Sequence, residues 1–96
     1  DMTKTLRFGA HAYYHEGVVY LPKGFKVKSI RDKSIVLHEL VHHWQYEQNI
    51  EVDCVRAKEK LAYETQRDYL IANKAKLMPE LSEFNIVMRS ICFFDE

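Results

Sequence analysis

Residues 34–45 read Ser-Ile-Val-Leu-His-Glu-Leu-Val-His-His-Trp-Gln, with the pattern His-Glu-x-x-His at their centre, from His38 to His42. No Gly or Pro occurs in residues 33–49, so a helix is expected there. Two histidines four residues apart lie on the same side of a helix, one turn apart. Both imidazoles can then reach one zinc ion, while Glu39 can reach a water molecule on that ion. The pattern predicts a zinc site with Glu39 as a catalytic base.

The composition predicts one soluble globular domain that covers residues 1–96. Of the 96 residues, 47% are apolar and 29% are charged, and the positive and negative charges are equal in number. A chain without net charge has no electrostatic attraction to nucleic acid or to a membrane surface, so neither is expected as a partner. No apolar run is long enough to span a membrane. The compartment stays open between secreted, periplasmic and cytoplasmic, and so does the oligomeric state.

The two cysteines, Cys54 and Cys92, form no Cys-x-x-Cys pair and are therefore not expected to bind zinc. They allow one disulfide or two free thiols. A disulfide would suit an oxidising compartment, but the sequence leaves the two alternatives open.

The N-terminal part of the chain has the period of a β-hairpin. Apolar and polar residues alternate from Thr5 to His15, which predicts a strand, interrupted or bulged at Gly9. Glu16-Gly17 is a turn signal, and the β-branched segment from Val18 to Leu21 follows as a second strand. We expect a small antiparallel sheet that packs on the motif helix.

Three helices are expected after the hairpin, which gives an α+β fold. The motif helix is predicted from Lys33 to Gln48, with Asp32 or Ser34 as its N-cap and Asn49 as its stop. A second helix is predicted from Cys54 to Lys76, capped by Asp53, and a third from Pro79 to Phe93. The third helix is expected to bury an apolar stripe formed by Leu81, Phe84, Val87, Met88 and Ile91.

A catalytic zinc usually takes three protein ligands, so a third ligand is expected from the second helix. Two glutamates there are candidates, Glu59 and Glu64. Glu64 lies about 140° around the helix from Glu59, on the flank. Glu59 lies at the centre of an apolar stripe, where a carboxylate is costly to bury unless it is paired or bound to a metal. We therefore predict one zinc ion per chain, bound by His38, His42 and Glu59. The other members of the stripe are Val52, Val55, Ala62, Tyr63, Gln66 and Leu70.

Residues 38–45, His-Glu-Leu-Val-His-His-Trp-Gln, and residues 59–66, Glu-Lys-Leu-Ala-Tyr-Glu-Thr-Gln, together resemble small zincin domains of the gluzincin kind. The chain looks most like poorly characterised bacterial families with the pattern HELVHHxQ followed by ExEAYxxQ. The resemblance covers about residues 10 to 70 and implies a zincin-like fold with metallopeptidase activity. It departs from the pattern at Leu61, where the family has its second glutamate. If that position held the ligand, this chain would be defective or would use another carboxylate.

The resemblance also gives Glu64 one argument as the ligand. Asp68 follows it by four residues, a spacing that some gluzincins use for an orienting carboxylate. Tyr63 and Gln66 are candidates to orient the ligands. His43 points about 100° away from His42 on a helix and is not expected to bind the metal.

The predicted function is hydrolysis of a peptide or amide bond by metal-activated water, with Glu39 as the general base. The substrate would be a peptide or protein that pairs with an edge strand of the hairpin, near Tyr13, Tyr14, His11 and His15. The alternative is a zincin-fold domain that binds zinc for a regulatory or protein-interaction role and has little turnover. An intact Glu39 favours the enzyme, whereas the small size of the domain favours the alternative.

Overall fold

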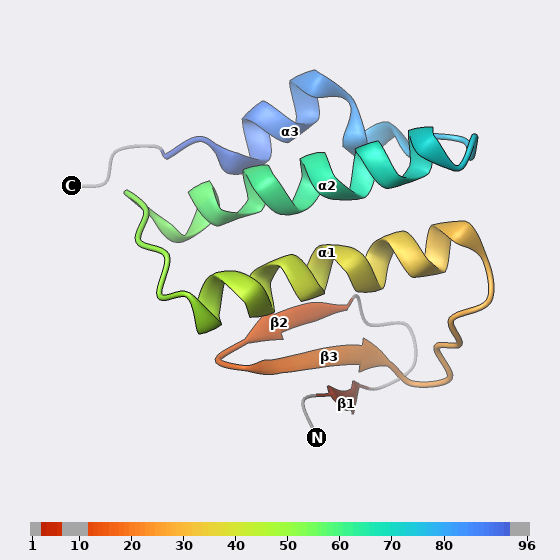
Figure 1. Cartoon of the computed structure of the whole chain (residues 1–96), viewed down its shortest axis with the longest axis horizontal. Coiled ribbons are helices and arrows are strands. Elements are labelled where there is room, and N and C mark those ends of the chain that lie inside the picture. Colours follow the sequence, from red (N-terminus) through yellow and green to blue (C-terminus); the bar gives the residue numbers. More distant parts are fainter. Residues whose placement is uncertain (1–2, 7–11, 93–96) are drawn as a thin grey trace.

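The computed structural model describes residues 3–6 and 12–92, and the side chains of residues 12–92. The central element is α1 (Ile30–Glu47), which carries the His-Glu-x-x-His pattern. A three-stranded sheet lies along one side of α1, and α2 (Lys58–Ala72) and α3 (Glu83–Ser90) lie along the other (Figure 1). This is the predicted α+β arrangement of an N-terminal hairpin followed by three helices. Within the described residues, no helix is both long enough and apolar enough to cross a membrane.

The sheet contains β1 (Thr3–Leu6), β2 (Tyr13–His15) and β3 (Val18–Pro22), in the order β1-β3-β2. The predicted hairpin is present, because β2 and β3 are antiparallel and pair Tyr14 with Val19. The segment from Thr5 to His15, predicted as a strand interrupted or bulged at Gly9, contributes to two strands, β1 and β2, which lie on opposite sides of β3. Gly9 and His11 lie outside the described residues. The sheet is also mixed rather than purely antiparallel, because β1 runs parallel to β3.

The turn at Glu16-Gly17 sets the register of this hairpin. Both residues have positive φ angles, 44° and 87°, as a two-residue hairpin loop of type I′ requires. A Cβ atom at position 17 would also lie 3.4 Å from the ring of Tyr46 on α1. The glycine is therefore required by the φ angle of the turn, since an added Cβ atom would make only an ordinary contact with Tyr46.

The motif helix begins earlier than predicted, because its N-cap is Ser29 rather than Asp32 or Ser34. The Ser29 hydroxyl accepts a hydrogen bond from the Asp32 amide at 3.0 Å, and the Asp32 carboxylate accepts one from the Ser29 amide at 3.2 Å. This capping box satisfies two backbone donors of the first turn. The predicted stop at Asn49 is correct, since α1 ends at Glu47 and Asn49 has a φ of 54°.

The second helix is shorter than predicted. A 3₁₀ turn (Val55–Ala57) precedes α2, and neither segment has a side-chain cap, so Asp53 is not the N-cap. The helix ends at Ala72 rather than Lys76. Lys74 adopts a φ of 55°, and the Ala75 amide donates to the Leu70 carbonyl at 2.9 Å, which closes the last turn.

The third helix is also shorter, and its predicted buried stripe is wrong. Pro79–Leu81 form a 3₁₀ turn, and the Ser82 hydroxyl then accepts a hydrogen bond from the Asn85 amide to cap α3. Of the predicted stripe, Leu81 is buried, whereas Phe84 is 72% exposed. Ile86 and Ser90 face the interior instead, because the interruption at Ser82 rotates α3 away from the phase that a continuous helix would have. The other exposed members of the stripe are Val87, Met88 and Ile91.

Two features hold the C-terminal part against the rest of the domain. Cys54 and Cys92 form a disulfide, which settles the alternative that the sequence left open. Next to it, the Arg56 side chain donates to the backbone carbonyls of Met88 and Ile91. Among residues 12–92, the buried apolar residues are Val19, Ala62, Leu70, Leu81 and Ile86.

Candidate metal centre

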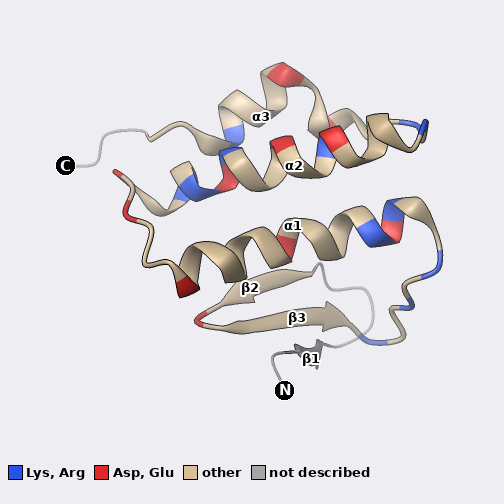
Figure 2. Ribbon diagram, viewed as in Figure 1, with Lys and Arg blue, Asp and Glu red and all other residues tan. Residues whose placement is uncertain are grey.

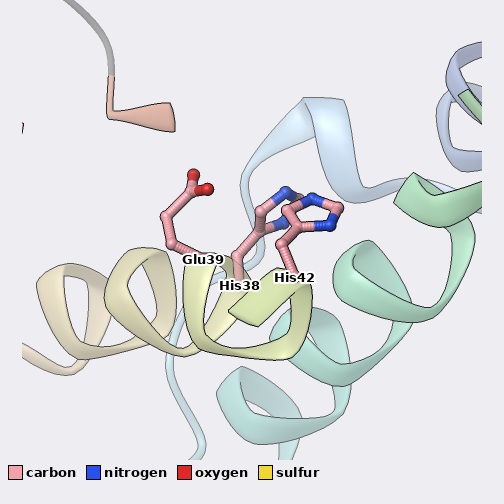
Figure 3. A group of neighbouring side chains, drawn as sticks. All are labelled: His38, Glu39 and His42. Carbon is pink, nitrogen blue, oxygen red and sulfur yellow. The ribbon is translucent and has the colours of Figure 1, made fainter. Parts of the chain in front are cut away.

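The motif side chains all rise from the same side of α1 (Figure 3). The imidazole rings of His38 and His42 lie together, with a centroid separation of 5.0 Å, and Glu39 lies beside them. One potential ligand atom from each of the three residues falls within 4.8 Å of the others. The four-residue spacing of the histidines on a regular helix is the direct cause of this grouping.

Glu59, from the first turn of α2, completes the group. Its Oε1 atom lies 2.9 Å from Nε2 of His38 and 3.1 Å from Nε2 of His42. The two histidines thus present the same ring nitrogen to one carboxylate oxygen. Antiparallel packing of α1 and α2 brings Glu59 opposite the middle of the motif, as the apolar stripe on α2 predicts.

These donors fit a zinc ion. A tetrahedral zinc site with bonds of about 2.0–2.1 Å separates its ligand atoms by about 3.3 Å. The two nitrogen–oxygen distances at Glu59 are close to that value. Two imidazoles and one carboxylate are also a donor set that zinc accepts in catalytic sites. The fit supports the prediction that His38, His42 and Glu59 bind zinc, which stays a prediction.

Two glutamines orient the histidine rings from behind. The side-chain carbonyl of Gln66 lies 3.0 Å from Nδ1 of His38 and accepts a hydrogen bond there. The amide group of Gln66 donates in turn to the hydroxyl of Ser34, which donates to the backbone carbonyl of Arg31. A carbonyl oxygen cannot donate, so the proton resides on Nδ1 of His38. This leaves Nε2 as the atom that faces Glu59.

His42 is held in the same way by a residue of its own helix. The carbonyl oxygen of Gln45 lies 2.9 Å from Nδ1 of His42, and the Gln45 amide donates to the Lys58 carbonyl at 3.1 Å. Gln45 therefore links the orientation of His42 to the start of α2, one residue before Glu59. Sequence analysis identified Gln66 as an orienting residue but missed Gln45. Its position three residues after His42 on a helix is the signal that could have revealed it.

The charges of this group support one another. Burial opposes ionisation of Glu59, but hydrogen bonds from His38 and His42 outweigh it and lower the pKa of Glu59 to about 2. Burial likewise opposes the charged form of His42, yet the hydrogen bond and negative charge of Glu59 raise its pKa above the ordinary 6.5. Glu59 and His42 therefore stabilise each other's charged forms, and a divalent cation could take the place of a proton between them.

Glu39 differs from Glu59 in having no partner. It is only 5% exposed, and among the described residues its carboxylate forms no hydrogen bond or ion pair. Burial raises the pKa of Glu39 above the ordinary 4.5, and the positive charges of His38 and His42 offset only part of this effect. Neither carboxylate oxygen is a fully buried atom without a partner, so the group lies at the lining of the cleft rather than sealed in the interior. A partly desolvated carboxyl group with a shifted pKa in a cleft is typical of a residue used for chemistry.

The group opens into a cleft of about 980 Å³. One wall is the hairpin, which contributes residues 12–16, and the opposite wall comes from α2 and α3. Because β2 pairs only with β3 among the described strands, its outer edge is free beside the cleft. His38, Glu39, His42 and Glu59 all line this space.

The remaining predicted residues occupy distinct positions. Tyr63 packs edge-on against the His38 ring at 4.5 Å. Tyr14, on β2, hydrogen-bonds to Nδ1 of His43 at 3.0 Å, so His43 anchors the hairpin rather than joining the donor group. Glu64 pairs with Lys60 on the flank of α2. Leu61 is 44% exposed and is absent from the cleft lining, so the departure from the family pattern falls outside the donor group.

One comparison places the chain among known proteins. Residues 3–96 match a family described as "Domain of unknown function (DUF6647)". The chain belongs to this family. No match was found to a curated protein or to a solved structure. Membership in the DUF6647 family covers nearly the whole chain but assigns no activity, so the function of the centre is argued from its residues.

Proposed function

We propose that this DUF6647 domain is a zinc-dependent hydrolase of peptide or amide bonds, with Glu39 as its general base. The observation that carries the proposal is that three potential donors, from α1 and α2, lie beside a carboxylate of α1 that forms no hydrogen bond among the described residues. His38, His42 and Glu59 converge within about one zinc coordination sphere, while Glu39 faces the same cleft without a hydrogen bond among the described residues.

A buried polar network kept only for stability would account for part of this arrangement. It would explain why His38 and His42 have partners on both ring nitrogens. It gives no reason to place the carboxyl group of Glu39 at the lining of the cleft, where no described residue hydrogen-bonds to it and a neutral residue would avoid the desolvation cost. The state of Glu39 therefore favours catalysis over structure.

Each residue has a distinct role in this proposal. His38, His42 and Glu59 would hold the zinc ion, and Gln66 and Gln45 keep the Nε2 atoms of the two histidines directed toward it. When bound, zinc would polarise the scissile carbonyl and acidify a water molecule. Glu39 accepts the proton of the attacking water and delivers it to the leaving amine. The raised pKa of Glu39 suits a group that must both accept and return a proton.

The cleft supports an extended peptide as the substrate. The outer edge of β2 can pair with a peptide backbone, which positions a chain without requiring particular side chains. The side chains of Tyr13 and His15 are exposed on the face of β2 opposite to that of Tyr14. A peptide bound there lies between the hairpin and the α2–α3 wall, where Glu39 lines the space.

The proposal is tested by measuring bound metal together with chelator-sensitive cleavage of a peptide library. We expect one zinc per chain in the purified protein and in the Glu39→Gln variant. We expect the variant to lose turnover by several orders of magnitude, because the water loses its proton acceptor. Zinc binding without any chelator-sensitive cleavage by the wild-type protein would instead identify a zinc-binding regulatory or interaction domain. A chain that binds no zinc would overturn both readings.

A further inference from the structure

The two walls of the cleft differ in charge. Neither β2 nor β3 contains Lys, Arg, Asp or Glu, whereas α2 and α3 carry both signs (Figure 2). The hairpin wall still carries one negative charge, at Glu16 in the turn, which lines the cleft. Among the described residues that line the cleft, the lysines and arginines all lie on the helices, so a cation that binds an anionic substrate must come from there.

Two cations of the α2–α3 wall line the cleft, Lys58 on α2 and Arg89 on α3. Arg89 is the one that also packs on an aromatic ring beside the donor group. It lies in the last turn of α3 and lines the cleft. Its guanidinium carbon is 5.9 Å from the centroid of the Tyr63 ring, and that ring packs against His38 at 4.5 Å. A single aromatic ring thus separates the guanidinium from a predicted metal ligand.

The other arginines of the described chain already have partners. Arg67 pairs with Asp68, and Arg56 donates to backbone carbonyls. Arg31 also lines the cleft, but its Nε atom lies 3.0 Å from the sulfur of Met78. Arg89 is exposed and has Tyr63 as its partner, through the ring and a side-chain hydrogen bond, but it forms no ion pair with any carboxylate of residues 12–92. Its five N–H donors, in a planar fork, match the geometry of a carboxylate.

We propose that the cleft selects substrates that carry a carboxylate on the α3 side of the bond to be cleaved, and that Arg89 binds it. An acidic side chain and a free C-terminus both present such a carboxylate. The inference rests on the proposed hydrolase function. The face of Tyr63 holds the guanidinium in place, so that little freedom is lost when it forms two hydrogen bonds to the ligand.

The test compares matched peptides as substrates of the zinc-loaded protein. One pair differs only by Glu against Gln, and the other only by a free against an amidated C-terminus. For the wild-type protein we expect kcat/KM to be at least about ten-fold higher for the carboxylate member of one pair, and the responsive pair identifies the source. In Arg89→Met, which keeps an apolar stem over Tyr63, this ratio should fall to about one. Arg89→Lys, which keeps the charge but not the fork, should retain part of it.

Arg31→Met is the matched control, because it removes a second cation that lines the same cleft. We expect it to keep the wild-type ratio. An equal ratio for both peptides in the wild-type protein would overturn the inference while leaving hydrolysis intact. An equal loss in Arg31→Met and Arg89→Met would also overturn it, since a diffuse field would then be responsible.

A binding measurement separates this inference from the proposed hydrolysis. The same peptide pairs are titrated into zinc-loaded Glu39→Gln with and without Arg89→Met. Preferential binding of the carboxylate peptide that disappears with Arg89→Met supports the inference even if the wild-type protein cleaves nothing. Equal binding of both members overturns it.

Discussion

The side-chain carbonyl oxygen of Gln66 lies 3.0 Å from Nδ1 of His38, and the same amide donates to the hydroxyl of Ser34. This pair joins the middle of α2 to the middle of α1 through buried atoms. A neutral amide occupies the position where many metal sites place a carboxylate. The ring of His38 is thus oriented without a second negative charge near Glu59.

Removing this hydrogen bond should weaken zinc binding. We expect Gln66→Leu to raise the zinc dissociation constant by about 10–100-fold, because the His38 ring loses the acceptor that fixes its tautomer. The measurement is competition with a chromophoric chelator. Gln48→Leu is the control, since Gln48 is exposed at the end of α1 and should leave the constant unchanged. Equal affinity in both variants would show that Gln66 does not orient the ligand.

The alanine variants of Glu59 and Glu64 should differ clearly in the amount of zinc that they bind. Glu59→Ala removes one of three donors and should purify with little zinc, whereas Glu64→Ala should retain a full complement. Glu64 lies on the flank of α2 with Lys60 as its partner, so its removal should cost less than about 0.5 kcal/mol of stability. Metal analysis by mass spectrometry checks the first expectation, and chemical denaturation checks the second. Zinc loss in Glu64→Ala with retention in Glu59→Ala would rule out Glu59 as the ligand.

The residues of the donor group could be predicted because the positions of these residues around α1 and α2 follow from helical periodicity. His38 and His42 share a face at any register of α1, and the phase of Glu59 on α2 differs from that of Glu64 by more than a third of a turn. Arg89 could not be anticipated. Its place beside Tyr63 depends on how α3 folds back, and the interruption at Ser82 changes the face that α3 buries.

The first turn of α1 should stabilise the domain in a pH-dependent way. The backbone hydrogen bonds that Asp32 accepts within the capping box, from Ser29 first of all, lower its pKa below the ordinary 3.8 despite the opposing effect of burial. A lowered folded-state pKa contributes stability that is fully present above about pH 4 and is lost as the pH falls through the folded-state value. We expect Asp32→Ala to lower the unfolding free energy by about 0.5–1 kcal/mol at pH 7, a range that solvent screening keeps small.

The difference between Asp32→Ala and the wild-type protein should shrink when urea unfolding is repeated near pH 3, with metal removed in both. The Ser29 hydroxyl remains as an acceptor in both proteins, so only the carboxylate part of the box is measured. A difference that stays constant from pH 7 to pH 3 would show that the charge of Asp32 contributes nothing.

The boundaries of the helices were harder to predict than their existence. Ser29 and Asp32 form a box with the spacing of a capping motif, yet Asp32 and Ser34 also fit the rule for single caps. Lys74 ends α2 in a left-handed conformation that glycine or asparagine would have signalled. The parallel pairing of β1 with β3 could not be predicted either. Alternation of apolar and polar residues shows which side chains share a face of a strand, but not which strand lies next to it or in which direction that strand runs.

The disulfide should contribute substantially to stability. Cys54 and Cys92 are 38 residues apart in sequence. A cross-link that closes a loop of that size lowers the conformational entropy of the unfolded chain and so stabilises the folded state by about 2–4 kcal/mol. We expect the double variant Cys54→Ser, Cys92→Ser to lose about that much unfolding free energy in urea. It should keep its zinc stoichiometry, because no predicted ligand is a cysteine. Loss of zinc together with an unchanged unfolding free energy would contradict this account.

The covalent loop that the disulfide closes also divides the centre into two halves. Glu59, Gln66 and Arg89 lie inside the loop, whereas His38, Glu39, His42 and the hairpin lie outside it. The exposed segment of residues 51–53 joins these halves along the chain. A single nick there would yield two fragments, one with the nitrogen donors and the base, the other a closed loop with the carboxylate and the substrate-facing cation. Under the proposed function, we expect reassociation of such fragments to depend on zinc, which would make the domain a natural starting point for a split zinc reporter.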